Sequence, residues 1–295
     1  MRNLTKGDSI QAQIIMRNYV MERFLERISL SKYRNNFILK GGMLVSAMVG
    51  LDSRSTMDID TTIKNMPLSV ETAREMIEEI IAIPIDDGMT FLIKSVGEIM
   101  GEVEYSGVRT NLEATLETMR TPLKIDISTG DIITPREVSY TFKLMFEERT
   151  ISILAYNLET VLAEKLETVI ARGVANTGLK DYYDLYILQN EYTPVIDMGQ
   201  FKAAFLATGK KRNSIQLMAD GNRILNEIAE SEIMQGLWKS YQKKFSYAED
   251  ITWVMVMALT QATKSHEITY TINDAMDVLQ LTQYKRHICK TKDIK

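Results

Sequence analysis

Apolar positions at the start of the chain recur at helical intervals. Ile10, Ile14, Met21, Phe24 and Ile28 would share one face of a helix, because residues three, four or seven apart line up along its axis. The segment therefore predicts an amphipathic first helix.

The chain then changes between helical spacing and two-residue alternation as far as about residue 155. An apolar run ends at Gly41 and Gly42, which predicts a strand that runs into a tight turn. Helical spacing predicts a short helix at 43–50 and a longer one at 69–81. Strands are predicted at 37–39, 56–63, 90–96, 107–116, 123–128, 140–146 and 150–154.

From Asn157 onward the apolar spacing is helical almost to the end. Behind the helix that begins there, further helices are predicted at 179–190, 197–207, 213–235, 248–263 and 272–282. Together these patterns predict an α+β chain with two domains. Residues 1–156 would form a mixed sheet flanked by helices, and residues 157–295 an all-helical domain.

Composition places the chain among ordinary globular proteins. Of 295 residues, 45% are hydrophobic and 25% are charged, which excludes a disordered or collagen-like chain. No apolar run approaches the length of a membrane span, and the first residues lack the apolar core of a secretory signal. We therefore expect a cytoplasmic protein that does not bind membranes.

The supply of reactive residues narrows the possible chemistry. Cys289 is the one cysteine, and His266 and His287 are the two histidines, so a disulfide framework, a Cys-rich zinc site and a Ser-His-Asp triad are not expected. Chemistry in this chain must rest on carboxylates and lysines. The net charge is −4, yet residues 201–295 carry 14 basic against 10 acidic residues, a gradient compatible with a polyanion at that end.

The segment 40–63 combines two features of a nucleotide site. Asp58 and Asp60 alternate on a predicted strand, so both carboxylates project to one face, where a divalent cation such as Mg²⁺ would relieve their repulsion. Gly41 and Gly42 would let the backbone approach nucleotide phosphates at the start of the next helix. A hairpin turn and an exposed Asp-x-Asp pair would explain either half alone.

A third aspartate lies within the predicted strand at 123–128. Alternation places Lys124, Asp126 and Ser128 on the face opposite the isoleucines. That polar face is either functional or the solvated face of an edge strand. The sequence leaves both explanations open.

Two helices after residue 157 oppose cations to carboxylates. Lys165 and Arg172 are two turns apart on one helix, and Asp181 and Asp184 share a face of the next. The arrangement is either an interhelical salt bridge or a phosphate-binding lysine beside an aspartate that orients it or accepts a proton.

The order of these motifs resembles that of a known superfamily. Strand, Gly-Gly, helix, Asp-x-Asp and a third strand aspartate is the signature of nucleotidyltransferases related to DNA polymerase beta. The strings KGG, RSTMDID, KIDIS, and AEKLE followed by KDYYDLY resemble the AbiEii/AbiGii toxin family of bacterial abortive-infection systems, over about residues 37–190. The superfamily often has Gly-Ser where this chain has Gly41-Gly42, and the gap from Gly42 to Asp58 is long for it.

The resemblance implies a role for each matching position. Asp58, Asp60 and Asp126 would be the metal ligands, and Asp126 would also help to deprotonate the acceptor hydroxyl. Lys165 would contact the triphosphate, and Asp181 matches the second catalytic acidic position. Nucleotide binding is assigned to Gly41, Gly42, Lys165 and Arg172.

The expected activity is therefore Mg²⁺-dependent transfer of a nucleoside monophosphate from an NTP to RNA, with tRNA as the expected acceptor and GTP or CTP favoured by the resemblance. Such a transfer would block translation. The resemblance also implies a phage-defence toxin with an antitoxin partner encoded nearby, and no DNA partner. Two alternatives are a transferase acting on a small molecule such as an aminoglycoside, and a non-catalytic module that binds a nucleotide or a partner.

Basic residues cluster in three segments of the C-terminal part, and in the first of them they are interleaved with aromatic residues. These are 239–247 (KSYQKKFSY), 210–212 (KKR) and 284–295 (YKRHICKTKDIK). Such segments can hold RNA by charge and stacking, but each is more often a solvated helix face.

Overall fold

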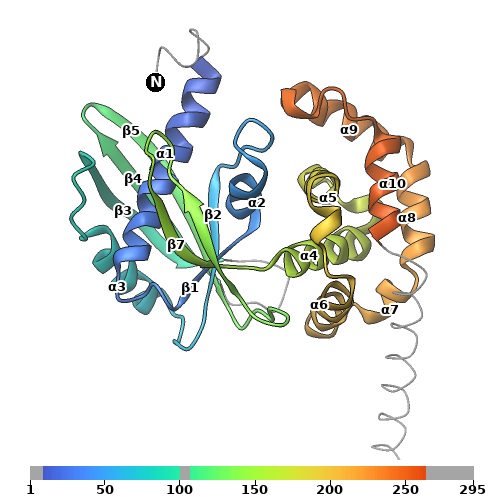
Figure 1. Ribbon diagram of the computed structural model, residues 1–295, viewed down its shortest axis with the longest axis horizontal. Coiled ribbons are helices and arrows are strands. Elements are labelled where there is room, and N and C mark those ends of the chain that lie inside the picture. The colour runs from blue at the N-terminus through green and yellow to red at the C-terminus, as the bar shows by residue number, and fades with distance from the viewer. Residues whose placement is uncertain (1–8, 100–106, 264–295) are drawn as a thin grey trace, which may run out of the picture. The chain divides into compact units, whose positions relative to one another are not determined.

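The computed structural model describes residues 9–99 and 107–263 (Figure 1). The helix predicted at 272–282 and the basic segment 284–295 lie outside these residues. The chain divides into two compact units, Met1–Asn157 and Leu158–Lys295. The first contains a sheet with helices, and the described helices after Asn157 belong to the second.

The first unit is built on a mixed seven-stranded sheet, so the predicted α+β fold class is confirmed. Its spatial order is β3-β4-β5-β2-β1-β7-β6, in which β2 pairs parallel with β5, and β1 parallel with β7. The remaining neighbours pair antiparallel. The strands are β1 (Phe37–Lys40), β2 (Asp58–Ile63), β3 (Met89–Glu98), β4 (Val108–Leu116), β5 (Met119–Thr129), β6 (Val138–Lys143) and β7 (Thr150–Ala155).

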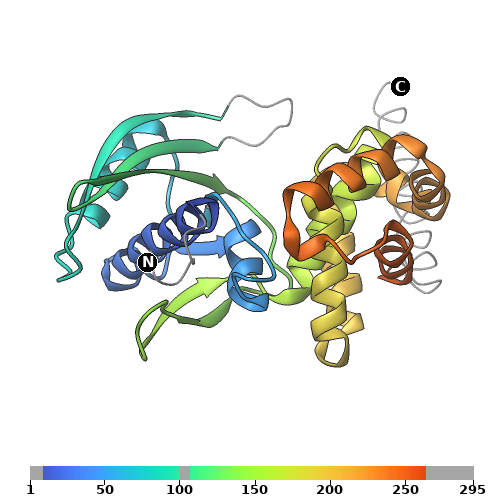
Figure 2. The ribbon, with the colours of Figure 1, turned by 90° about the horizontal axis from the view of Figure 1, so that it is seen from above.

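The described helices that accompany the sheet are α1 (Ser9–Leu30), α2 (Gly41–Val49) and α3 (Val70–Ile81). The sheet curves around α1, which contacts β5 and β7, while α3 packs on β3 and β4 (Figure 2). On the predicted apolar face of α1, Met21, Phe24 and Ile28 are buried. Ser69 begins α3 through a capping box, in which its hydroxyl accepts from the Thr72 N–H at 3.1 Å.

The turn predicted at Gly41 and Gly42 is instead the first turn of α2. Lys40 at the end of β1 has an extended backbone, and Gly41 has φ = 65°. Because a left-handed φ strains residues that carry a Cβ, glycine allows the chain to pass from strand to helix without a loop.

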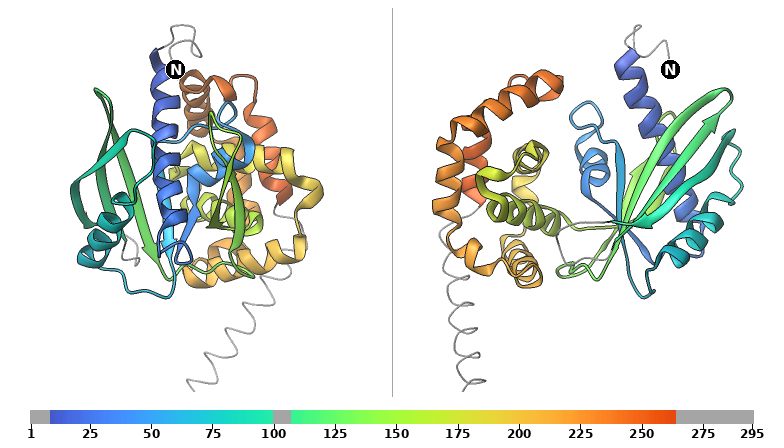
Figure 3. Two further views of the ribbon diagram at one scale, coloured as in Figure 1. Left: turned by 60° about the vertical axis from the view of Figure 1, so that its left-hand side comes forward. Right: turned by 180° about the vertical axis from the view of Figure 1, so that it is seen from behind.

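Helices of the second unit surround α4 (Leu158–Arg172), which contacts α5, α6, α7 and α8 (Figure 3). The apolar stripe predicted behind Asn157 is buried, including Leu162, Leu166 and Val169. The other α-helices of its described part are α5 (Leu179–Tyr192), α6 (Met198–Lys211), α7 (Ile215–Ala219), α8 (Gly221–Glu230), α9 (Glu232–Lys244) and α10 (Trp253–Thr263).

The single helix predicted at 213–235 is wrong, because three helices occupy that region. The helical pattern is interrupted at Asp220 and at Ser231. Ser231 has an extended backbone, and its hydroxyl accepts from the Met234 N–H, so it ends one helix and caps the next. Apolar spacing continued across these breaks and concealed them. None of the described helices has both the length and the apolar character needed to cross a membrane.

Candidate active site

Three aspartates lie on one face of two neighbouring strands of the first unit. The parallel register of β2 and β5 places Asp60 opposite Asp126, and Asp58 opposite Lys124. Alternate residues of a strand share a face, and neighbouring strands are about 4.8 Å apart. Because β5 lies between β4 and β2, the edge-strand explanation of Asp126 is wrong. The sheet brings together the three carboxylates that the sequence predicted as one group.

Two cations from β4 and β5 neutralise part of this acidic group. Nε and Nη2 of Arg109 donate to Oδ1 and Oδ2 of Asp126, at 2.8 Å each. Nζ of Lys124 lies 2.7 Å from Oδ2 of Asp58. Alternation along β4 places Arg109 on a half-exposed face, yet sequence reasoning missed it, because only the sheet register sets it opposite Asp126.

Asp60 packs against the first turn of α2. A Cβ placed on Gly41 would lie 2.2 Å from Oδ2 of Asp60, which is closer than atoms can approach. The N–H of Gly42 donates to the Asp60 carboxylate. In this structure the two glycines therefore admit and hold a carboxylate, and their contact with nucleotide phosphates stays a prediction.

The surroundings of Asp60 disfavour its ionised form. Burial raises the pKa of the Asp60 carboxyl, and the negative charges of Asp126 and Asp58 raise it further. The positive charge of Lys40 and the Gly42 N–H act in the opposite direction without cancelling this effect. The group thus carries a concentration of negative charge that a divalent cation would relieve.

Lys40, the lysine of the KGG string, is anchored beside this group. Its Nζ donates to Oγ of Ser128 at 2.8 Å and forms an ion pair with Asp131. Asp131 also accepts from the Tyr156 hydroxyl, at 2.7 Å. Burial acts to raise the pKa of Asp131, but the Lys40 charge and these hydrogen bonds hold it below its usual value. Sequence reasoning missed Asp131 and Tyr156, which follow the predicted strands and belong to no motif.

The aspartate group fits a magnesium ion by donor type, and its side chains are engaged elsewhere in this structure. Carboxylate oxygens are the ligands that Mg²⁺ prefers, and three carboxylate groups lie on this face of the sheet. Among residues 9–99 and 107–263, however, no three His, Cys, Asp or Glu side chains are arranged as they stand to hold a metal ion. Asp58 and Asp126 point to Lys124 and Arg109 instead. Metal ligation by Asp58, Asp60 and Asp126 therefore stays a prediction.

A second charged cluster joins α4 to α5 within the second unit. Nζ of Lys165 lies 2.6 Å from Oδ2 of Asp184 and 3.2 Å from Oδ1 of Asp181. The Asp184 side chain is fully buried, whereas that of Asp181 is 25% exposed. The predicted pairing of these helices is present for Lys165. Arg172, two turns beyond Lys165, is the exposed last residue of α4.

The basic segments of the second unit differ in what their side chains do. In the segment 239–247 the aromatic rings pack on one another, with Tyr241 4.7 Å from Phe245 between ring centroids and 5.2 Å from Trp238. Its lysines are exposed. In the segment 210–212, Arg212 pairs with Glu167 at 2.6 Å and so links α6 to α4. These aromatic rings and Arg212 have structural roles here, and RNA binding by the exposed lysines stays a prediction.

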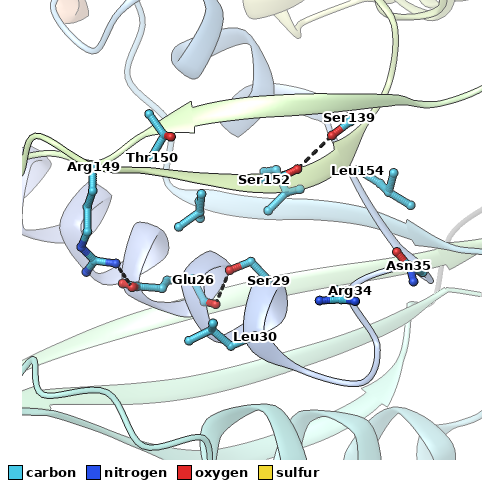
Figure 4. A pocket seen from close by; sticks show the side chains of 12 residues that line it. Glu26, Ser29, Leu30, Arg34, Asn35, Ser139, Arg149, Thr150, Ser152 and Leu154 are labelled. Carbon is cyan, nitrogen blue, oxygen red and sulfur yellow. Dashed lines mark hydrogen bonds and ion pairs between the residues drawn. The ribbon is translucent and has the colours of Figure 1, made fainter.

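A pocket of about 500 Å³ opens between α1 and β7, and the three aspartates are not among its lining residues (Figure 4). Arg149 and Glu26 form an ion pair at one side of it. The hydroxyls of Ser139 and Ser152 lie 2.9 Å apart at the other. The pocket is therefore separate from the predicted catalytic site, whose three aspartates lie on β2 and β5.

Comparison with family models identifies one family, and comparison with solved structures identifies the fold. The family model of the nucleotidyl transferase AbiEii toxin of type IV toxin–antitoxin systems matches residues 23–262. The crystal structure of JHP933 from Helicobacter pylori is 11% identical, with a TM-score of 0.52 and coverage of 92% of this chain and 98% of that one. A candidate nucleotidyltransferase from H. pylori is 12% identical, with a TM-score of 0.51 and coverage of 89% and 97%. Comparison with curated proteins gives no significant match.

Proposed function

The chain belongs to the AbiEii family of nucleotidyl transferase toxins, and we propose that it transfers a nucleoside monophosphate from an NTP to tRNA, thereby blocking translation. Membership confirms the predicted family and the predicted enzyme class. The family belongs to type IV toxin–antitoxin systems, which implies an antitoxin partner. The tRNA acceptor, the preference for GTP or CTP and the role in phage defence are parts of the proposal.

The observation that carries the proposal is the register of β2 against β5. It sets Asp126 beside Asp60 and two residues from the position of Asp58, with the first turn of α2 against Asp60. Carboxylates concentrated next to helix N–H groups suit a site for a metal–triphosphate. A cation would bridge the carboxylate oxygens and the phosphate oxygens, and the N–H groups would favour the phosphates. No histidine or cysteine is required, which agrees with their scarcity in the chain.

In the proposed reaction the acceptor hydroxyl attacks the α-phosphorus in line with the leaving pyrophosphate. A new oxygen–phosphorus bond forms, the bond between the α- and β-phosphates breaks, and Asp126 takes the hydroxyl proton. In this structure both oxygens of Asp126 accept hydrogen bonds from Arg109, so Asp126 must release Arg109 before it can take the proton or bind a cation. Mg²⁺ held by Asp58, Asp60 and Asp126 would supply charge neutralisation at the phosphates.

The other predicted site residues keep their predicted roles in the proposal. Gly41 and Gly42 would lie closest to the phosphates in the first unit. Lys165 would supply a positive charge to the triphosphate, with Asp181 as the second acidic group and Arg172 as an additional cation. The support for Lys165 is its position between two carboxylates, which fix its ammonium group where α4 meets α5.

A labelling assay tests this function. The protein is incubated with total RNA, Mg²⁺ and each of the four α-labelled NTPs in turn, and labelled RNA species are separated by size. We expect label in the tRNA fraction with one or two NTPs. Asp58→Ala should reduce it at least about 100-fold, because charge neutralisation at the phosphates contributes several kcal/mol and each 1.4 kcal/mol is tenfold in rate.

The control for Asp58→Ala is Asp86→Ala. Asp86 is an exposed aspartate on the connection between α3 and β3, and its loss should leave labelling unchanged. Labelling of small molecules but not of RNA would favour the small-molecule alternative. Absence of label with all four NTPs, while expression still stops growth, would rule out a transferase mechanism in favour of binding.

A further inference from the structure

The space above Gly42 is filled by a threonine from another part of the chain. A Cβ placed on Gly42 would lie 2.7 Å from Oγ1 of Thr56 and 3.2 Å from Nη2 of Arg54. Carbon and oxygen atoms that are not bonded do not approach to 2.7 Å without displacement. Any side chain at position 42 would therefore extend into the space that the Thr56 hydroxyl occupies.

The loop between α2 and β2 is fastened so that Thr56 remains in this place. The hydroxyl of Ser46 on α2 donates to the Arg54 carbonyl at 2.6 Å, and the Arg54 N–H donates to the Gly50 carbonyl at 3.0 Å. The first bond ties the loop to α2, whose first turn contains Gly42, and the second ties it to Gly50 at the end of α2. Thr56 follows two residues later and leads directly into the Asp58–Asp60 strand.

The Thr56 hydroxyl is only weakly engaged within the protein. Its hydrogen bond runs to the Asp58 carbonyl at 3.4 Å, whereas hydroxyl–oxygen bonds are commonly about 2.7–2.8 Å. The residue is 6% exposed, so the hydroxyl lies in a confined place beside the first turn of α2. A buried hydroxyl with a long hydrogen bond is available for a stronger acceptor, and a phosphate oxygen is one.

We propose that Thr56 supplies the side-chain hydroxyl that binds a phosphate of the nucleotide at the start of α2. At the position after Gly41 this chain carries Gly42, which has no hydroxyl of its own, and the hydroxyl nearest to it is that of Thr56. The hydroxyl comes from the loop beside the helix, and Gly42 must remain glycine to leave it room. The proposal rests on the proposed function, because it assumes a nucleotide triphosphate at this site.

Variants that remove the hydroxyl of residue 56 or place one on residue 42 test the proposal. The variants are Thr56→Val, which keeps the shape of the side chain, Thr56→Ser, Gly42→Ser, Thr56→Ala and the double variant Gly42→Ser/Thr56→Ala. The readouts are the Kd of the Mg²⁺ complex of a non-hydrolysable NTP by calorimetry, the thermal midpoint, and the rate of label transfer.

Thr56→Val and Thr56→Ala should weaken nucleotide binding about tenfold, which corresponds to about 1.4 kcal/mol, while Thr56→Ser should bind within about twofold of the wild type. Gly42→Ser alone should lower the thermal midpoint because of the clash. The double variant should bind the nucleotide more tightly than Thr56→Ala, because it carries a hydroxyl on residue 42. It should melt above Gly42→Ser, because the side chain of residue 56 no longer clashes with that of residue 42.

Two results would overturn the proposal. One is nucleotide binding by a folded Thr56→Val variant that equals the wild type. The other is a folded double variant that binds no better than Thr56→Ala. Failure of the proposed function would look different, because the wild type would then transfer no label to RNA while the comparison of Kd values still decides the role of Thr56. A wild type that binds no NTP would overturn both.

Discussion

At the scale of single residues, the ionised form of Asp60 is unfavourable in the folded protein. The folded protein surrounds this carboxyl with protein atoms and with two further aspartates, which raises its pKa. The same surroundings suit a divalent cation, because the charge that destabilises the protein alone would stabilise its complex with the metal. Stability and function are therefore opposed at Asp60.

This opposition predicts that Asp60→Asn stabilises the protein and inactivates it. A folded-state pKa above the ordinary value of 3.8 means that the folded protein binds the Asp60 proton more tightly than the unfolded chain does. Ionisation at neutral pH therefore lowers the free energy of unfolding, and the variant avoids that loss. Thermal melts without metal should show a higher midpoint for Asp60→Asn at pH 7, with the difference shrinking as the pH falls toward 3.8.

The matched control for this comparison is Asp86→Asn, an exposed aspartate whose replacement should change neither the midpoint nor its pH dependence. A lower midpoint for Asp60→Asn at pH 7 would show that its hydrogen bond from Gly42 outweighs the repulsion. In the labelling assay Asp60→Asn should lose at least about 100-fold in rate.

Gly41 allows a second prediction, in which a clash is separated from backbone strain. Gly41→Ala would place a Cβ 2.2 Å from Oδ2 of Asp60 at φ = 65°. We expect a loss of at least about 2 kcal/mol in the free energy of unfolding, together with loss of transfer activity, since Asp60 must move. Urea denaturation and the labelling assay measure the two effects.

Gly50→Ala is the control, because Gly50 also has a left-handed φ, of 90°, but an added Cβ there would meet no atom within 4 Å beyond its neighbours in the chain. It should cost about 1–3 kcal/mol through strain alone and reduce the activity less than Gly41→Ala does. Equal loss of activity in both variants would mean that the contact with Asp60 is not what Gly41 provides.

At the scale of elements, the contact between α4 and α5 depends on one buried ion pair more than on the other. Asp184 is fully buried against Lys165, and Asp181 is partly exposed at its side. Asp184→Ala should lower the free energy of unfolding by about 3–5 kcal/mol, because it leaves the Lys165 ammonium group without its buried partner. Asp181→Ala should cost less than about 1 kcal/mol.

Urea denaturation of the two variants measures this difference. The labelling assay then separates structure from chemistry: Asp181→Ala should remain folded and lose activity if Asp181 is the second acidic group. A folded and fully active Asp181→Ala variant would remove Asp181 from the proposed site while leaving the structural role of Asp184 intact.

At the scale of the whole molecule, metal binding should appear as stability. A ligand that binds the folded protein alone raises the free energy of unfolding, by about 2.7 kcal/mol at a concentration one hundred times its Kd. Mg²⁺ should therefore raise the thermal midpoint of the wild type in a concentration-dependent way. Asp60→Asn should lose this shift, whereas Asp86→Asn should keep it.

An equal shift with Mg²⁺ in the wild type and in Asp60→Asn would place the metal elsewhere. Because the shift is measured without nucleotide or RNA, it tests the metal site independently of the transfer reaction. The result also bears on Asp58 and Asp126, which must leave Lys124 and Arg109 to take part in metal binding.

Much of the fold could be predicted, because helices and strands have local periods. The two-residue alternation predicted the common face of Asp58 and Asp60 and the polar face of Asp126, and the helical spacing behind Asn157 predicted α4. The helix breaks at Asp220 and Ser231 were missed, since apolar spacing continues across them.

The sequence by itself determined which residues are available for chemistry and which face of its strand or helix each one shares, because alternation and helical spacing are properties of the local backbone. Only the tertiary structure decided what meets them. The sheet order placed β5 inside the sheet and brought Arg109 to Asp126, and the fastening of one loop placed Thr56 over Gly42. Such contacts depend on register and packing between distant segments, to which no local pattern of residues corresponds.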